Sequence, residues 1–137
     1  MQPLPVILGL VALATVLGIV LRGLQGRVSQ RNGRDALALP DGISLGRGAT
    51  LLQFSTEVCS PCRATHTVLD GIASGRDDVA HVDLDLTHRP DLASRYNILQ
   101  TPTTFILDRH GVVRARIGGA ARRDSVQAEL DRILVVA

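Results

Sequence analysis

Residues 51–66 read LLQFSTEVCSPCRATH and contain the two cysteines of the chain, Cys59 and Cys62. An apolar run ends shortly before the first cysteine, and a helical pattern continues after the second. The first thiol is therefore expected at a strand-to-helix junction, where unpaired backbone N–H groups and the helix dipole favour a thiolate. Two residues between the thiols let them close a small disulfide ring by local rearrangement. The spacing predicts a reversible dithiol.

The two cysteines do not indicate a structural zinc site. No second pair of cysteines completes a four-ligand shell, and no pair of histidines follows at finger spacing. His66 lies four residues after Cys62, so a Cys59/Cys62/His66 site for zinc or Cu(I) is an alternative. Three ligands on a helix that also carries Pro61 leave its shell incomplete. We expect no metal and no cofactor other than the disulfide itself.

Charge and composition argue against a nucleic-acid partner. All 15 basic residues are arginine. Residues 1–35 carry four arginines against one aspartate, a net charge of +3, whereas residues 36–137 carry eleven arginines against twelve acids, a net charge of −1. The second part has only Phe54, Phe105 and Tyr96 as aromatics. It lacks the charged stripe and the stacking residues that single-strand binding uses.

The pattern after residue 49 alternates strands and helices. Apolar runs and period-two alternation predict strands over residues 50–55, 79–86, 103–107 and 112–117. Helices are predicted from the dithiol to about Gly75, over residues 90–96, and around Val126, Leu130, Ile133 and Leu134. The tight turn 108–111 should join the last two strands as an antiparallel hairpin. This order predicts an α/β fold with helices on both faces of one sheet.

The N-terminal part predicts a membrane anchor. Residues 3–21 carry no charge, and a helix of 19 residues reaches roughly 28 Å, about the hydrocarbon thickness of a bilayer. A cleaved signal peptide is the alternative, but the start lacks a positive region and a small-residue cleavage site. We expect an anchor at 1–23, an Arg/Gly-rich linker at 24–48 and a domain at 49–137. Residues 36–39 or 43–45 are candidates for an additional edge strand.

The flanks of this apolar segment predict its orientation. Four arginines follow the segment within 13 residues and none precedes it. The positive-inside rule then places the N-terminus outside and the domain in the cytoplasm of a single-pass protein of the cell membrane. The alternative is an extracytoplasmic domain whose linker happens to be arginine-rich.

Three motifs resemble the thioredoxin superfamily. They are the stretch VCSPCR at 58–63, the tripeptide Thr-Pro-Thr at 101–103 and the glycine pair at 118–119. The resemblance covers residues 49–136 and implies a three-layer α/β/α fold with a mixed four-stranded sheet, or five-stranded with the edge strand. Residues 102–108 are similar to anchored thiol-disulfide oxidoreductases, and the whole chain looks like membrane-anchored thioredoxin-like proteins of high-GC bacteria.

The resemblance implies roles for the dithiol and for the loop around Pro102. Cys59 is the attacking nucleophile and Cys62 the resolving thiol. Pro102 is expected to follow a cis peptide bond beside the dithiol and to leave the Thr101 backbone free to pair with substrate. Further substrate-contacting positions are Val58, Ser60, Pro61 and Gly118. The Ser60 hydroxyl either donates to the Cys59 thiolate or is only a tolerated small residue.

The chain departs from the superfamily at three positions. Val58 replaces the usual Trp before the first cysteine, and Gln53 replaces a buried Asp that accepts the proton of the resolving thiol. His81 stands where a Lys normally pairs with that Asp. An imidazole titrates near physiological pH, so His81 is a candidate substitute general base. The alternative is an imidazole that is hydrogen-bonded beside Gln53 and has no kinetic role.

These observations predict a membrane-anchored thiol-disulfide oxidoreductase that reduces protein disulfides through a mixed disulfide. Its expected partners are protein disulfide substrates, an upstream thiol electron donor and the membrane. Two alternatives remain open. One is a redox-silent binding module, in which Val58 and Gln53 mark lost catalysis, and the other is a copper or zinc carrier that uses the same dithiol.

Overall fold

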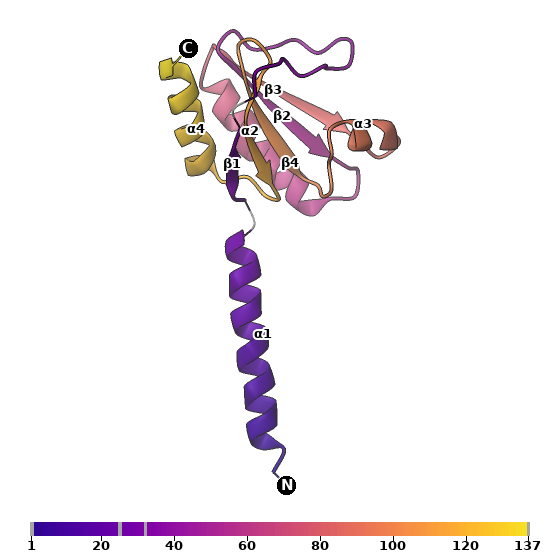
Figure 1. Cartoon of the computed structure of the whole chain (residues 1–137), viewed down its shortest axis with the longest axis vertical. Helices are drawn as coiled ribbons and strands as arrows, with labels where there is room; N and C mark the ends of the chain where they lie inside the picture. The colour runs from indigo at the N-terminus through magenta and orange to yellow at the C-terminus, as the bar shows by residue number, and fades with distance from the viewer. Residues whose placement is uncertain (1, 25, 32, 137) are drawn as a thin grey trace.

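The computed structural model describes residues 2–24, 26–31 and 33–136, and its elements follow the predicted order with one addition. In chain order they are α1 (Leu4–Leu24), β1 (Val28–Gln30), β2 (Ala49–Ser55), α2 (Ser60–Ser74), β3 (Val79–Asp85), α3 (Pro90–Arg95), β4 (Thr103–Asp108), β5 (Val113–Gly118) and α4 (Arg123–Val136). Figure 1 shows α1 projecting away from a three-layer α/β domain that the other elements form.

The sheet is mixed and has five strands in the order β1-β5-β4-β2-β3. Strands β2 and β3 are parallel, and the remaining neighbours pair antiparallel. The predicted hairpin over residues 103–117 is present as the β4–β5 pair. Phe54 at the end of β2 pairs with Thr103 at the start of β4. The loop that follows β2 and the loop that precedes β4 therefore lie at the same end of the sheet.

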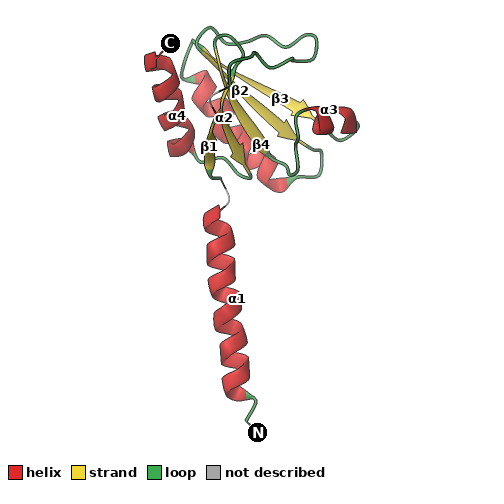
Figure 2. Cartoon of the chain, in the orientation of Figure 1, coloured by secondary structure: helices red, strands yellow, loops and turns green. Residues whose placement is uncertain are grey.

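Helices cover both faces of the sheet, as predicted (Figure 2). On one face α2 and α4 enclose a core that includes Leu51, Leu69, Ile106 and Leu130. On the other face α3 and the loop after it cover a second core with Phe54 at its centre, whose ring lies 4.9 Å from the ring of Phe105 between centroids. All seven residues of β2 are buried because this strand lies between β4 and β3 and under both helical layers.

The fifth strand differs from the prediction. It comes from Val28–Gln30, and not from residues 36–39 or 43–45. Only Val28 of this short strand packs against the core, so no apolar run marks it in the sequence. Ala36 makes an isolated bridge to Val112, and residues 37 and 39 pack against the second core. The folded region therefore begins inside the expected linker 24–48, before the expected domain start at 49.

Helix α1 has 21 residues and all the side chains that the structure describes in it are exposed. At 1.5 Å per residue it is about 31 Å long, enough to cross the hydrocarbon core of a bilayer. It is apolar along this length and carries a single charged residue, Arg22, in its last turn. By length and composition, α1 is a candidate membrane span.

Candidate active site

Cys59 and Cys62 form a disulfide at the N-terminal end of α2. Cys59 is the residue that precedes the helix, with an extended backbone, and its side chain does not cap the helix. Cys59 is half-buried whereas Cys62, one turn further on, is only 3% exposed. Pro61 occupies the first turn, where its missing N–H costs no hydrogen bond. The outer sulfur is thus the more accessible of the two, and the inner one is shielded.

The loop that carries Pro102 lies beside the loop that carries the dithiol. The hydroxyl oxygens of Thr56 and Thr101 are 3.5 Å apart, and the Thr101–Pro102 peptide bond is cis, as the resemblance implied. The Pro102 carbonyl accepts a hydrogen bond from the N–H of Gly119, next to the expected site residue Gly118 at the end of β5. The Thr101 N–H and C=O make no hydrogen bond with the described part of the chain.

Two apolar side chains near the dithiol and Pro102 are exposed to solvent. Val58 precedes the dithiol and is 97% exposed, and Leu99 lies in the loop before Pro102 and is 86% exposed. The sequence identified Val58 as a substrate-contacting residue but not Leu99. The signal for Leu99 is an apolar residue outside the helical pattern, two positions before Thr101 of the Thr-Pro-Thr motif.

Gln53 connects the dithiol to His81 inside the protein. Its side chain is fully buried, its amide Nε2 donates to the Cys62 carbonyl at 2.9 Å, and its Oε1 lies 3.0 Å from Nε2 of His81. The Cys62 carbonyl can only accept, which fixes the orientation of the amide. The Oε1 of Gln53 therefore faces His81, so the His81 Nε2 carries the hydrogen and donates it. His81 is thus hydrogen-bonded to Gln53, as expected if the imidazole has no kinetic role.

His81 is held in an environment that favours the neutral imidazole. Its side chain is 4% exposed, and burial lowers its pKa, with a further lowering from nearby His66. The carboxylates of Asp83 and Asp70 act to raise the pKa, but the net shift remains a lowering. Because Nε2 holds the hydrogen in the neutral ring, Nδ1 has the free lone pair.

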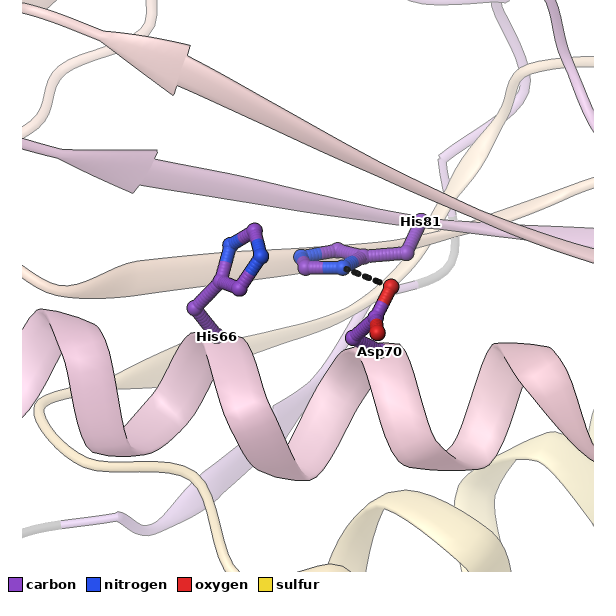
Figure 3. Close-up of side chains that lie close together, drawn as sticks. All are labelled: His66, Asp70 and His81. Carbon is purple, nitrogen blue, oxygen red and sulfur yellow. Dashed lines mark ion pairs between the residues drawn. The ribbon is translucent and has the colours of Figure 1, made fainter.

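His81 belongs to a cluster of polar side chains between α2 and β3 (Figure 3). His66 and Asp70 lie one turn apart on α2 and point toward His81 on β3. The rings of His66 and His81 are 4.7 Å apart between centroids, and the His66 Nδ1 lies 3.0 Å from a carboxylate oxygen of Asp83. The sequence did not identify Asp70, although its spacing of four from His66 places the two residues on one helix face.

A surface pocket of about 390 Å³ lies beside Cys62. The other residues that line it are Ser55, Thr56, Arg63, His66, Thr67 and Asp83. His81 is not among the residues that line this pocket, although its neighbours His66 and Asp83 are. The pocket gives water a route to the inner cysteine.

The three residues of the alternative metal site, Cys59, Cys62 and His66, have other partners in this structure. The two cysteines are bonded to one another, while the His66 ring is turned to Asp83 and His81. Among the described residues, His66, Asp70 and His81 each have a possible metal-ligand atom within 4.8 Å of those of the other two (Figure 3).

Comparisons with known proteins agree with this geometry. The thioredoxin family model matches residues 41–132. The chain is 30% identical to thioredoxin of Chlamydia trachomatis over 99 residues, covering 72% of this chain and 88% of that protein. It is 31% identical to thioredoxin H2 of Arabidopsis thaliana over 83 residues, 61% of each chain.

Some relatives are matched over only part of their length. The chain spans 44% of chloroplastic thioredoxin M4 of Arabidopsis thaliana, and, as given above, less than two thirds of thioredoxin H2. Among solved structures, a mutant thioredoxin from Halobacterium salinarum superimposes with a TM-score of 0.57 at 22% identity, covering 64% of this chain and 76% of that one. At this identity the match concerns the fold alone.

Proposed function

The chain belongs to the thioredoxin family, and we propose on this premise that it is a membrane-anchored oxidoreductase that reduces protein disulfides. The observation that carries the proposal is the Cys59–Cys62 disulfide at the start of α2, with Pro102 in the adjacent loop. The cofactor is this disulfide itself. Protein disulfides are the substrates, and a thiol reductant upstream restores the dithiol.

Cys59 is proposed as the nucleophile. It lies at the positive end of the dipole of α2, which favours its thiolate, and it is the more accessible sulfur. The thiolate attacks one sulfur of a substrate disulfide, so that a Cys59–substrate disulfide forms and the other substrate sulfur leaves as a thiolate.

Cys62 is proposed as the resolving thiol. Once deprotonated, it attacks the Cys59 sulfur, the bond between Cys59 and the substrate breaks, and the second substrate thiol leaves. Two electrons have then passed from the dithiol to the substrate, and the Cys59–Cys62 disulfide is restored. We assign the proton of Cys62 to water in the adjacent pocket of about 390 Å³, since Gln53 cannot accept it.

Substrate binding is proposed for the surface around the two loops. The exposed side chain of Val58 takes the place of the family's aromatic, and Leu99 adds a second apolar contact. The free backbone groups of Thr101 are placed to pair with an extended substrate chain, as in strand addition. Ser60, Pro61 and Gly118 complete the surface, with Ser60 and Pro61 exposed and Gly118 half-buried.

His81 is proposed as a positioning residue and not as the general base. Its Nε2–H holds the amide of Gln53, and the amide in turn holds the backbone of Cys62. The nitrogen with the free lone pair, Nδ1, is the one that faces Asp70, at 3.9 Å from its Oδ1. To act as the base for Cys62, His81 would have to direct this lone pair toward the Cys62 sulfur and not toward Asp70.

Substitutions of His81 test this role through the rate of mixed-disulfide resolution. We expect His81→Ala to slow resolution roughly 3- to 10-fold at every pH, the equivalent of one net hydrogen bond. His81→Gln, which can still donate to Gln53, should restore most of the rate. Stopped-flow measurement from pH 5 to 9 gives both rate and profile. If either variant removes a titration step that the wild type shows, His81 is the base after all.

The anchor is proposed to be α1, with the linker and domain that follow it in the cytoplasm. The apolar length of α1 supports a single membrane span, and the arginines after it support the cytoplasmic side. A reducing compartment would keep the dithiol in the form that attacks disulfides. No nucleic-acid partner is proposed.

The experiment that tests the function is reduction of insulin by the full-length protein in detergent, with a small dithiol as electron donor. Turnover is expected, and it should depend on Cys59. A protein that shows no turnover above the donor alone would instead be the redox-silent binding module.

A further inference from the structure

The cluster between α2 and β3 has a geometry that the proposed redox function does not use. His66 and Asp70 come from adjacent turns of α2, His81 comes from β3, and one ligand atom of each lies within 4.8 Å of the others. Figure 3 shows the three side chains converging on the space between the helix and the strand. His66 and Asp70 are exposed, so this space is open to ions from solvent.

The hydrogen bond to Gln53 fixes which nitrogen of His81 faces the cluster. Because Nε2–H donates to Gln53, the neutral ring presents the Nδ1 lone pair to the carboxylate of Asp70, 3.9 Å away. Two acceptors thus face one another at a distance longer than a hydrogen bond. A cation between them would be bound by both.

His66 is oriented in the same way. Its Nδ1 lies 3.0 Å from the Asp83 carboxylate, which is itself held by the Ser55 hydroxyl. A carboxylate that accepts the hydrogen of one imidazole nitrogen leaves the other nitrogen free to bind a metal, an arrangement that metal-binding histidines commonly have. The second nitrogen of His66 is turned toward His81 in Figure 3.

We propose that His66, Asp70 and His81 bind a divalent cation of the Zn²⁺ class, with Gln53 and Asp83 as the outer partners that orient the two imidazoles. Two imidazoles and one carboxylate are ligands that Zn²⁺ and Co²⁺ accept, with water in the remaining position. The carboxylates of Asp70 and Asp83 balance the charge of the ion.

The site needs only modest movement to reach bonding geometry. Ligand atoms around a tetrahedral zinc lie about 3.3 Å apart, given bonds of about 2.0 Å. The His81 side chain is 4% exposed and held by its hydrogen bond to Gln53, whereas the side chains of His66 and Asp70 are 50% and 65% exposed and can turn toward it. Binding would clamp α2 to β3 without involving either cysteine.

Titration of the oxidised full-length protein with Co²⁺ in detergent tests the site. The disulfide keeps both sulfurs from binding the metal, and cobalt bound by nitrogen and oxygen ligands absorbs visible light without a thiolate charge-transfer band. We expect saturation at one Co²⁺ per chain and displacement by Zn²⁺. His66→Gln and Asp70→Asn should each weaken binding by at least about 10-fold. These two residues are exposed, so the variants should fold, which far-UV circular dichroism checks.

The two remaining histidines supply matched controls. His88→Gln and His110→Gln should bind Co²⁺ as the wild type does. The proposal is overturned if the oxidised protein binds no cobalt, if His66→Gln binds as tightly as wild type, or if binding appears only after reduction, which would assign the metal to Cys59 and Cys62. None of these results depends on disulfide reductase activity.

Discussion

Cys59→Ser is expected to abolish insulin reduction, lowering the rate by at least about 10³-fold, as the loss of a covalent nucleophile typically does. A serine hydroxyl is not ionised at neutral pH and does not attack a disulfide. Cys62 cannot take over the attack because it is 3% exposed and lies one turn inside the helix. The rate is measured at pH 7 with full-length protein in detergent and a dithiol donor.

Ser74→Ala, a similarly small change at the opposite end of α2, is the control and should keep the wild-type rate. Two outcomes would contradict the assignment. A Cys59→Ser protein that still reduces insulin, beside an inactive Cys62→Ser protein, would exchange the roles of the two cysteines. Equal low rates for wild type and variant would favour a binding module without redox function.

The full-length protein is expected to stay in the membrane fraction after an alkaline carbonate wash, and a double Leu10→Arg/Leu13→Arg variant is expected to be released. Both leucines lie near the middle of α1 and are exposed. Each arginine at the centre of a span opposes insertion by about 3 kcal/mol, so the pair opposes it by about 6 kcal/mol. Immunoblotting of pellet and supernatant gives the distribution.

Leu24→Arg is the matched control, since Leu24 is the last residue of α1 and lies near Arg22 at the expected interface. It should remain in the pellet. Release of the wild type by carbonate would show that α1 is not a stable span. The side of the membrane is read from reduced Cys59: in intact cells a maleimide that cannot cross the membrane should leave it unlabelled, and labelling would place the domain outside.

Local sequence patterns were sufficient to predict the strand that is buried along its whole length and the helices that bury one face. The apolar run over residues 50–55 marks a strand that is buried throughout, and the spacing of Val126, Leu130 and Ile133 marks the inner face of α4. Neither pattern needs knowledge of distant residues. The motif around Pro102 was also informative, since the resemblance implied the cis peptide bond that the structure has.

Features that depend on strand register were outside the reach of local patterns. β1 has one core-packed residue out of three, so its place at the sheet edge follows from pairing with β5 and not from its own sequence. Gln53 and His81 are 28 residues apart, and they meet because β2 and β3 pair in parallel with Leu51 opposite His81. The resemblance indicated this neighbourhood, but not the direction of the hydrogen bonds.

The cluster around His81 was missed for the same reason. His66 and Asp70 share a helix face by their spacing, yet a pair of exposed polar residues on a helix is ordinary. Only the packing of α2 on β3 brings His81 to them. The alternative that joined His66 to the cysteines relied on proximity in sequence, while the tertiary structure turns the ring toward Asp83.

Capture of the mixed disulfide on Cys59 tests the central claim most directly. The Cys62→Ser protein, incubated with insulin and then alkylated, should show by intact-mass measurement one covalent insulin-chain adduct that a dithiol removes, and the Cys59→Ser protein should show none. An adduct that accumulates on Cys59→Ser but not on Cys62→Ser, or on neither protein, would contradict the assignment of Cys59 as nucleophile and Cys62 as resolving thiol.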